Sequence, residues 1–183
     1  MIVLVAYASR HGSTMEIAQR IAAVLREAGF RTEVRSVDAI GDITPYDAFV
    51  IGGAAYMFHW LKEATVFVQR HRDTLARRPT WLFSSGPLGT DLVDEAGHDI
   101  LETTRPREFD ELEGLIHPRD EHVFFGAWDP EDPPAGLGEW VLRHLPASPE
   151  IPSGDFRDWP AIDAWAASIV DDLRARQPAQ ASR

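Results

Sequence analysis

Cysteine is absent from this 183-residue chain, and its absence removes several kinds of chemistry. Without a thiol, the chain cannot form disulfides, ligate an iron–sulfur cluster or use a cysteine nucleophile, so any redox chemistry must come from a bound cofactor. No run of about 18 apolar residues is present, so we expect no membrane-spanning segment. A charged N-terminal region followed by a cleavage site is also missing, and we therefore expect a cytoplasmic protein.

Basic side chains are scarce, since 18 Lys and Arg stand against 29 Asp and Glu, for a formal net charge of −11. This balance argues against nucleic acid as a partner and against docking on an anionic membrane surface. The negative charge either keeps the protein soluble or steers it towards a basic partner protein. The seven histidines include no pair at the i, i+4 spacing of a helical zinc site, so we expect no metal.

Apolar runs bounded by Gly, Pro and Asp alternate along the chain with segments of helical periodicity. The apolar runs predict five strands, at residues 2–7, 32–37, 48–51, 80–83 and 122–128. The periodic segments predict helices at residues 14–28, 61–75, 108–115, 137–145 and from 159 onward. This alternation is typical of an α/β domain and favours a three-layer α/β/α sandwich around a parallel sheet. We expect one domain over residues 1–175 and a disordered polar tail over residues 176–183.

The most informative segment is the hydroxyl-rich loop at residues 9–14, between the first predicted strand and the first predicted helix. Such a turn directs backbone N–H groups and hydroxyls at a helix N-terminus, which is a ready anion site. The loop lacks the lysine of a triphosphate loop and the three glycines of a dinucleotide loop, so it predicts a single phosphate, as in a mononucleotide. Arg10 would either add charge there or face the solvent. The alternative is a capping turn without a ligand.

Four loops follow the ends of the first, third, fourth and fifth predicted strands. Parallel strands bring such loops to one edge of the sheet. They are residues 8–14, 52–60, 84–90 and the segment from Trp128 onward. The second of these loops is unusually aromatic, with Tyr56, Phe58 and Trp60 in five residues. Because loops lie at the surface, this favours a ligand contact by Tyr56. Trp60 is either a second ring near the ligand or a core residue.

Residues 7–14 resemble the phosphate loop of the flavodoxin family. Ser9, Gly12 and Thr14 match the family pattern, while His11 stands where a threonine is usual. Within that family the chain is most similar to bacterial flavodoxin-domain proteins related to menaquinone-dependent protoporphyrinogen oxidase. Residues 51–56, 83–89 and 154–159 carry that closer resemblance.

The resemblance implies a flavodoxin-like fold with five parallel strands in the order 2-1-3-4-5, and FMN as the cofactor. It places the phosphate at one set of residues and the isoalloxazine ring at two others. The implied phosphate residues are Ser9, Arg10, His11, Gly12, Ser13 and Thr14. The implied ring residues are Ala54, Ala55 and Tyr56 after the third strand and Ser84, Ser85, Gly86, Pro87 and Leu88 after the fourth, where backbone N–H groups would bind the flavin carbonyls.

Three functions are compatible with these residues. The first is an FMN-dependent oxidoreductase that transfers electrons between the flavin and a small organic substrate, a quinone or a porphyrinogen-like molecule. Leu88 favours it, because carriers of this family often have a second aromatic ring there, and its replacement leaves one flavin face more open. The second is a soluble flavodoxin-type electron carrier that docks to redox partners, which the acidic charge favours. The third is a flavin-free interaction module. The apolar residues at 56–61 would serve a homodimer contact equally well.

Overall fold

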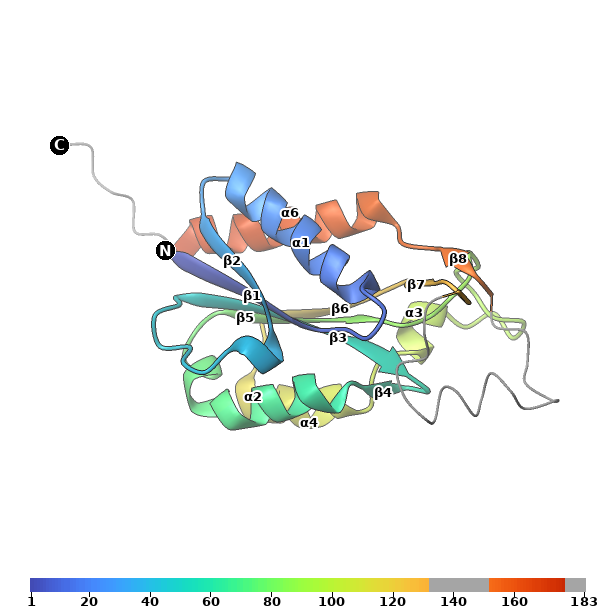
Figure 1. Cartoon of the computed structure of the whole chain (residues 1–183), viewed down its shortest axis with the longest axis horizontal. Coiled ribbons are helices and arrows are strands. Elements are labelled where there is room, and N and C mark those ends of the chain that lie inside the picture. Colours follow the sequence, from blue (N-terminus) through green and yellow to red (C-terminus); the bar gives the residue numbers. More distant parts are fainter. Residues whose placement is uncertain (132–151, 177–183) are drawn as a thin grey trace.

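A parallel sheet runs through the centre of the computed structural model, which describes residues 1–131 and 152–176 (Figure 1). Five strands lie in the spatial order β2, β1, β3, β5, β6, and every neighbouring pair is parallel. Their bounds are β1 (Ile2–Ala8), β2 (Arg31–Ser36), β3 (Ala48–Tyr56), β5 (Thr80–Ser85) and β6 (Asp120–Phe124). The short β4 (His59–Trp60) folds back antiparallel onto the end of β3. Numbered without β4, the order is 2-1-3-4-5, so the predicted topology is confirmed.

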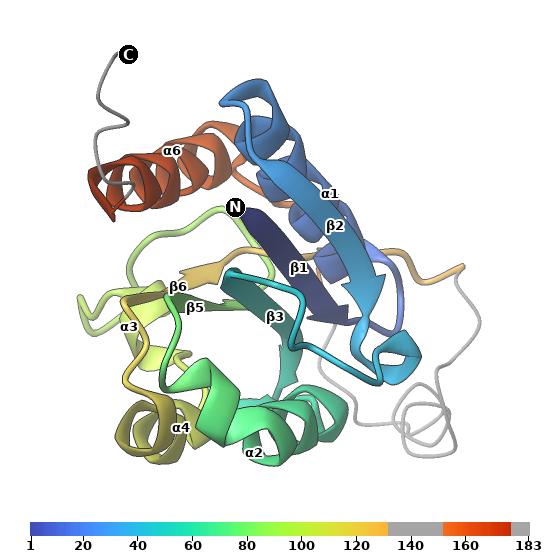
Figure 2. The ribbon, with the colours of Figure 1, turned by 90° about the vertical axis from the view of Figure 1, so that its left-hand side faces the viewer.

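Helices cover both faces of the sheet and complete the three predicted layers (Figure 2). One face carries α1 and α6 side by side, and the other carries α2 and α4. The helical bounds are α1 (Ser13–Glu27), η1 (Val37–Ala39), α2 (Lys62–Leu75), α3 (Ile100–Thr103), α4 (Glu108–Ile116) and α6 (Trp159–Arg176).

The central strand β1 shows why the sequence forms this sandwich. Its residues from Val3 to Ala6 are all fully buried, as expected for a strand covered by helices on both faces. Because side chains alternate along a strand, Leu4 packs into the layer of α2 and α4, while Val3 packs into the layer of α1 and α6. A continuous apolar run is therefore needed here, rather than an alternating one.

The fifth predicted strand, residues 122–128, is divided in the structure. β6 ends at Phe124, and the Gly126 N–H then donates to the carbonyl of Pro87 at 2.9 Å. The chain leaves the sheet at this point and forms β7 (Ala127–Trp128), which pairs antiparallel with β8 (Gly154–Asp155). This small ribbon lies beyond the carboxyl ends of the parallel strands (Figure 1).

The carboxyl ends of β1, β3 and β5 meet where the strand order reverses, which is where ligands bind in sheets of this kind. Two glycines within β3, Gly52 and Gly53, pair with the last two residues of β1 and let bulky rings lie directly on the sheet. A Cβ on Gly52 would stand 1.9 Å from the ring of Phe83, and one on Gly53 would stand 2.5 Å from Nε1 of Trp60. Any side chain at these positions would displace an aromatic ring beside the strand ends.

The predicted helix over 137–145 and residues 177–183 of the predicted tail lie outside the described residues, while Arg176, the first residue of that predicted tail, is the last residue of α6. Within the described residues, no helix combines the length and the apolar character needed to span a membrane.

Candidate functional site

The loop at residues 9–14 has the geometry of an anion site. Gly12 takes a left-handed conformation, with a φ of 87°, and the Glu16 N–H donates to the Gly12 carbonyl at 3.0 Å as the first helical hydrogen bond of α1. The Ser9 hydroxyl accepts from the Gly12 N–H at 3.1 Å, which fixes the turn. The N-cap residue, Gly12, has no side chain that could cap α1. The N–H groups in the first turn of α1 are therefore available to an anion.

Thr14 adds a second, independent sign of a ligand. Its side chain is only 1% exposed, and Oγ1 has no hydrogen-bond partner among the described residues. Leaving a buried hydroxyl unpaired costs about 1–3 kcal/mol. Because Thr14 also lines a cavity at the strand ends, a bound group in that cavity would remove the cost.

This cavity has a volume of about 320 Å³, within the range of ligand pockets, and its walls are chiefly apolar. It brings together ten of the predicted site residues: Ser9, His11, Ser13, Thr14, Ala54, Ala55, Tyr56, Ser85, Gly86 and Leu88. Four further lining residues, Met57, Gly126, Ala127 and Trp128, were not among the predicted site residues. The sequence did offer a sign that Trp128 belongs here. Trp128 ends the fifth predicted strand, and the carboxyl ends of parallel strands gather at the same edge of the sheet.

The other four predicted site residues do not line the cavity. Arg10 reaches towards α2, where its Nη2 lies 3.8 Å from Oε1 of Glu63. Gly12 shapes the loop through its backbone, and Ser84 is fully buried in β5, with a hydroxyl that has no described partner. Pro87 contributes only the carbonyl that accepts from Gly126.

The loop at residues 84–88 packs against the end of β6. The Gly86 N–H donates to the carbonyl of Phe124 at 3.2 Å, so this amide is already engaged within the protein. A Cβ at Gly86 would lie 3.0 Å from the carbonyl oxygen of Ala55, so a side chain would crowd the neighbouring strand end. The absence of a side chain keeps this wall of the cavity close to β3.

A hairpin between β3 and β4 forms the rim of the cavity. Tyr56 pairs with His59, and the two residues between them, Met57 and Phe58, have φ angles of 49° and 67°. Two successive positive φ angles are typical of a type I′ turn, which favours Asn and Gly. For other residues the left-handed conformation costs about 1–2 kcal/mol each. The turn nevertheless displays Met57 at 81% exposure, so strained backbone presents apolar side chains to the solvent.

Glu108, the first residue of α4, holds this hairpin in place. Its Oε1 lies 2.8 Å from Nδ1 of His59, and its Oε2 accepts from the Trp60 N–H at 2.9 Å. The Arg107 N–H also donates to the Phe58 carbonyl at 3.0 Å. Burial pushes the pKa of Glu108 upward, but the hydrogen bonds from Trp60 and His59 outweigh burial and leave that pKa below its ordinary value.

Trp60 belongs to the core rather than to the cavity. It is 3% exposed, and its indole N–H donates to the Gly53 carbonyl at 3.0 Å. Its ring meets Phe109 of α4 edge to face, with centroids 5.2 Å apart. Of the two alternatives that the sequence left for Trp60, the structure therefore supports the core residue.

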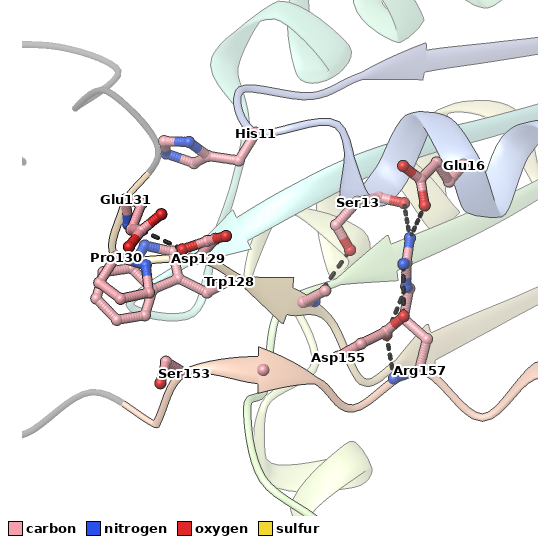
Figure 3. A pocket seen from close by; sticks show the side chains of 12 residues that line it. His11, Ser13, Glu16, Trp128, Asp129, Pro130, Glu131, Ser153, Asp155 and Arg157 are labelled. Carbon is pink, nitrogen blue, oxygen red and sulfur yellow. Dashed lines mark hydrogen bonds and ion pairs between the residues drawn. The ribbon is translucent and has the colours of Figure 1, made fainter.

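A second cavity, of about 700 Å³, adjoins the first and has Ser13 in its wall (Figure 3). It shares His11, Ser13, Ala127 and Trp128 with the first cavity. Its remaining walls are largely polar, and they include four carboxylates: Glu16, Asp129, Glu131 and Asp155. It is the larger of the two, but the apolar cavity is the one that suits a flat aromatic ligand.

Arg157 lies at the wall of this second cavity between two carboxylates (Figure 3). Its Nε and Nη2 each lie 2.7 Å from an oxygen of Asp155, and its Nη1 lies 2.6 Å from Oε2 of Glu16. The guanidinium also stacks over Trp159, with Cζ 4.5 Å from the ring centroid. The hydrogen bond from Arg157 holds the pKa of Asp155 below its ordinary value.

The residues of the apolar cavity fit FMN, the group implied by the sequence resemblance. The unpartnered hydroxyl of Thr14 and the free end of α1 suit a phosphate. The apolar walls, with Tyr56, Met57 and Trp128 among them, suit the isoalloxazine ring.

Comparison with curated proteins finds protoporphyrinogen IX dehydrogenase (quinone) from Escherichia coli K12, which is 31% identical to this chain over 86 residues. The alignment covers 46% of this chain and 48% of that protein, so it spans about half the length of the curated relative. Two other Escherichia coli strains give the same match.

Comparison with solved structures finds the same fold. Rubredoxin oxygen:oxidoreductase from Desulfovibrio gigas superposes with a TM-score of 0.61 at 13% identity, over 97% of this chain but only 37% of that protein. A cysteine-to-serine mutant of flavodoxin from Pseudomonas aeruginosa superposes with a TM-score of 0.59 at 15% identity, over 95% of this chain and 99% of the flavodoxin.

A family model described as "Flavodoxin domain" matches residues 4–131, which is more than half of the chain. The matched range contains every residue that lines the apolar cavity. The chain therefore belongs to the flavodoxin domain family, a family of electron-transfer flavoproteins whose cofactor is FMN.

Proposed function

We propose that the apolar cavity holds FMN, with the phosphate at residues 9–14 and the isoalloxazine ring between the loops after β3 and β5. The unpartnered Thr14 hydroxyl, buried beside the first turn of α1, carries this assignment of the phosphate. Ser13 would contribute as well. Its hydroxyl accepts from the Ala127 N–H at 3.0 Å, which leaves the Ser13 proton to be donated to a phosphate oxygen.

The ring would lie against Tyr56, with Met57 and Trp128 on the surrounding walls. An aromatic side chain stacked on a flat heterocycle contributes about 1–3 kcal/mol to binding, by analogy with nucleobase stacking. Leu88 lines the cavity without offering a second stacking surface, so the side of the ring that faces Leu88 would stay accessible. The residues that line the cavity would thus bind the flavin without enclosing it.

We propose further that the protein is an FMN-dependent oxidoreductase acting on a small apolar molecule, a quinone or a porphyrinogen-like compound. The observation that carries this is the exposed apolar hairpin at residues 56–59, on the rim of the cavity. The partial relative from Escherichia coli, named as a protoporphyrinogen IX dehydrogenase, supports the same substrate class. When bound, FMN supplies two-electron redox chemistry, and the chain supplies position and a largely apolar surrounding.

The test is a reaction of the FMN-loaded, chemically reduced protein with menadione in the absence of oxygen. We expect the 450 nm absorbance of the flavin to return at a rate that saturates with menadione concentration, as two electrons from the reduced flavin and two protons, from the flavin and the solvent, convert the quinone to the quinol. A rate that rises linearly without saturation and equals that of free reduced FMN would refute a substrate site. A chain that binds neither FMN nor riboflavin would refute the flavin assignment as well.

An electron carrier is the second candidate, and the net charge of −11 favours it, because acidic surfaces steer docking to basic partner proteins. Cytochrome c, a basic one-electron acceptor, tests this candidate under the same conditions. Reduction of cytochrome c that is faster than reduction of menadione and slows steeply with added salt would favour the carrier.

A further inference from the structure

Arg157 is a nearly buried cation in an acidic part of the molecule. Its side chain is 8% exposed, whereas Glu16 and Asp155, its two carboxylate partners, are each about half exposed. Among the described residues that line the two cavities, Arg157 is the only lysine or arginine, and four of the lining residues are carboxylates. Its three nitrogens are all used by the two ion pairs, so its charge serves to balance its neighbours.

The contacts of Arg157 connect this charge neutralisation to the loop at residues 9–14. Glu16 lies in the first turn of α1, two residues after Thr14. Arg157 Nη1 also lies 3.5 Å from the carbonyl oxygen of Ser13, while the Ser13 hydroxyl accepts from Ala127. Ala127 in turn pairs with Asp155 across β7 and β8. Figure 3 shows Ser13 and Glu16 on one side of Arg157 and Asp155 on the other.

An acidic side chain in the first turn of a helix is usually favourable, because it faces the positive end of the helix dipole. At an anion-binding helix the same charge competes with the ligand. A carboxylate within one turn of a bound phosphate lies well inside the Debye length of about 8–10 Å, so its repulsion is not screened away. A partly buried ion pair with a guanidinium cancels most of that repulsion.

We propose that Arg157 is a positioning residue for the phosphate of the flavin: it neutralises Glu16 and fixes Ser13, so that the start of α1 accepts a phosphate monoester. The proposal rests on the proposed flavin site. The proposal also gives the second cavity a role. Arg157 in its wall neutralises Glu16, a carboxylate that would otherwise repel a phosphate in the apolar cavity. Residues 155–157 are distant in sequence from the loop at residues 9–14, but they thereby set part of the electrostatic potential at that loop.

The test compares the affinities of FMN and riboflavin, which differ only in the phosphate, by quenching of flavin fluorescence in the flavin-free full chain. We expect R157Q to weaken FMN binding about ten-fold or more, while riboflavin binding changes by less than about two-fold. The double variant E16Q/R157Q should recover most of the lost FMN affinity, because the uncompensated carboxylate in the first turn of α1 is gone, although Asp155 remains. A merely structural role would weaken both flavins and would not be rescued.

Arg20→Gln is the matched control. Arg20 also extends from α1 and forms a bidentate ion pair, with Asp163 of α6, at 2.5 and 2.6 Å. R20Q makes the same change in net charge, and we expect it to leave the affinities of both flavins unchanged.

E16Q alone keeps the proposal testable if R157Q fails to fold, and we expect it to bind FMN at least as tightly as the wild type. Three results would each overturn the proposal: weaker FMN binding by E16Q, equal losses of affinity for FMN and riboflavin in R157Q, or no recovery of FMN affinity in E16Q/R157Q. A wild-type chain that binds neither flavin would instead refute the proposed flavin site.

Discussion

The two ends of the apolar cavity are built in opposite ways. The loop at residues 9–14 leads into a long helix, carries the buried hydroxyl of Thr14, and is tied to β7 and β8 through Ser13 and Arg157. The hairpin at residues 56–59 has a strained turn, exposes its apolar side chains and depends mainly on Glu108 for its anchorage. One end is preorganised and polar, and the other is exposed and apolar.

This difference separates two contributions to binding. Fixed dipoles and hydroxyls at the loop act on a phosphate alone, so changes there should affect FMN and spare riboflavin. Stacking at the hairpin acts on the ring that both flavins share, so changes there should affect both ligands about equally. Three variants test this separation, and a fourth tests the backbone strain of the hairpin.

Thr14→Val should have the largest effect. It replaces the buried, unpartnered hydroxyl with a methyl group of similar size, and a lost hydrogen bond to a charged phosphate costs about 1.5–3 kcal/mol of FMN affinity. Riboflavin affinity should not change, and denaturant unfolding of the flavin-free chain should show no loss of stability. Ser84→Ala is the control, since its hydroxyl is also buried and unpartnered but lies outside the cavity. FMN affinity that falls in S84A and not in T14V would reverse the assignment.

Tyr56→Ala should come next. Loss of the stacking ring should weaken FMN and riboflavin alike, by about 1–3 kcal/mol, measured by the same fluorescence titration. Tyr56→Phe keeps the ring and should retain the affinity of both flavins. A loss confined to FMN would mean that Tyr56 contacts the phosphate side rather than the ring.

Glu108→Gln should have a smaller effect on both flavins. It weakens the hydrogen bonds to His59 and to the Trp60 amide that hold the hairpin, and we expect a loss of about 0.5–1.5 kcal/mol in flavin affinity. Glu111→Gln on the same helix is the control, because Glu111 bonds Gln69 and does not touch the hairpin. Equal effects of E108Q and E111Q would show that general loosening of α4, not the hairpin contact, is responsible.

The double substitution Met57→Asn with Phe58→Gly should have the smallest effect, and its sign is opposite. Asn-Gly suits a turn with two positive φ angles, so strain of about 1–2 kcal/mol per residue is relieved, partly offset by the entropy that glycine loses on folding. We expect the free energy of unfolding to rise by about 0.5–1 kcal/mol in a urea titration. Lower stability would show that the exposed side chains of the turn, rather than its backbone, set its energetics.

Much of the fold was predictable from the sequence, because strands, helices and loop ends follow from local periodicity. The same periodicity, with the gathering of strand ends at one edge, predicted that Ser9, Thr14 and Tyr56 would share a site. The same argument pointed to the loop at residues 84–90, and the family resemblance added Ser85 and Leu88 within it.

The remaining features depend on contacts between segments that are distant in the sequence. Arg157 meets Glu16 across 141 positions, and Glu108 meets His59 across 49, which no local pattern encodes. The division of the fifth strand depends on Gly126 bonding the Pro87 carbonyl, and the engagement of the Gly86 amide depends on Phe124. Local reasoning therefore found which loops line the apolar cavity, but not what holds each loop in place.

A parallel titration of the flavin-free, wild-type chain with FMN and with riboflavin tests the central claim most directly. The proposed site requires that both flavins bind and that FMN bind about ten-fold or more tightly, because only FMN reaches the hydroxyls and the helix end at residues 9–14. Equal affinities for the two flavins would contradict a phosphate site at that loop, and no binding of either would contradict the flavin site altogether.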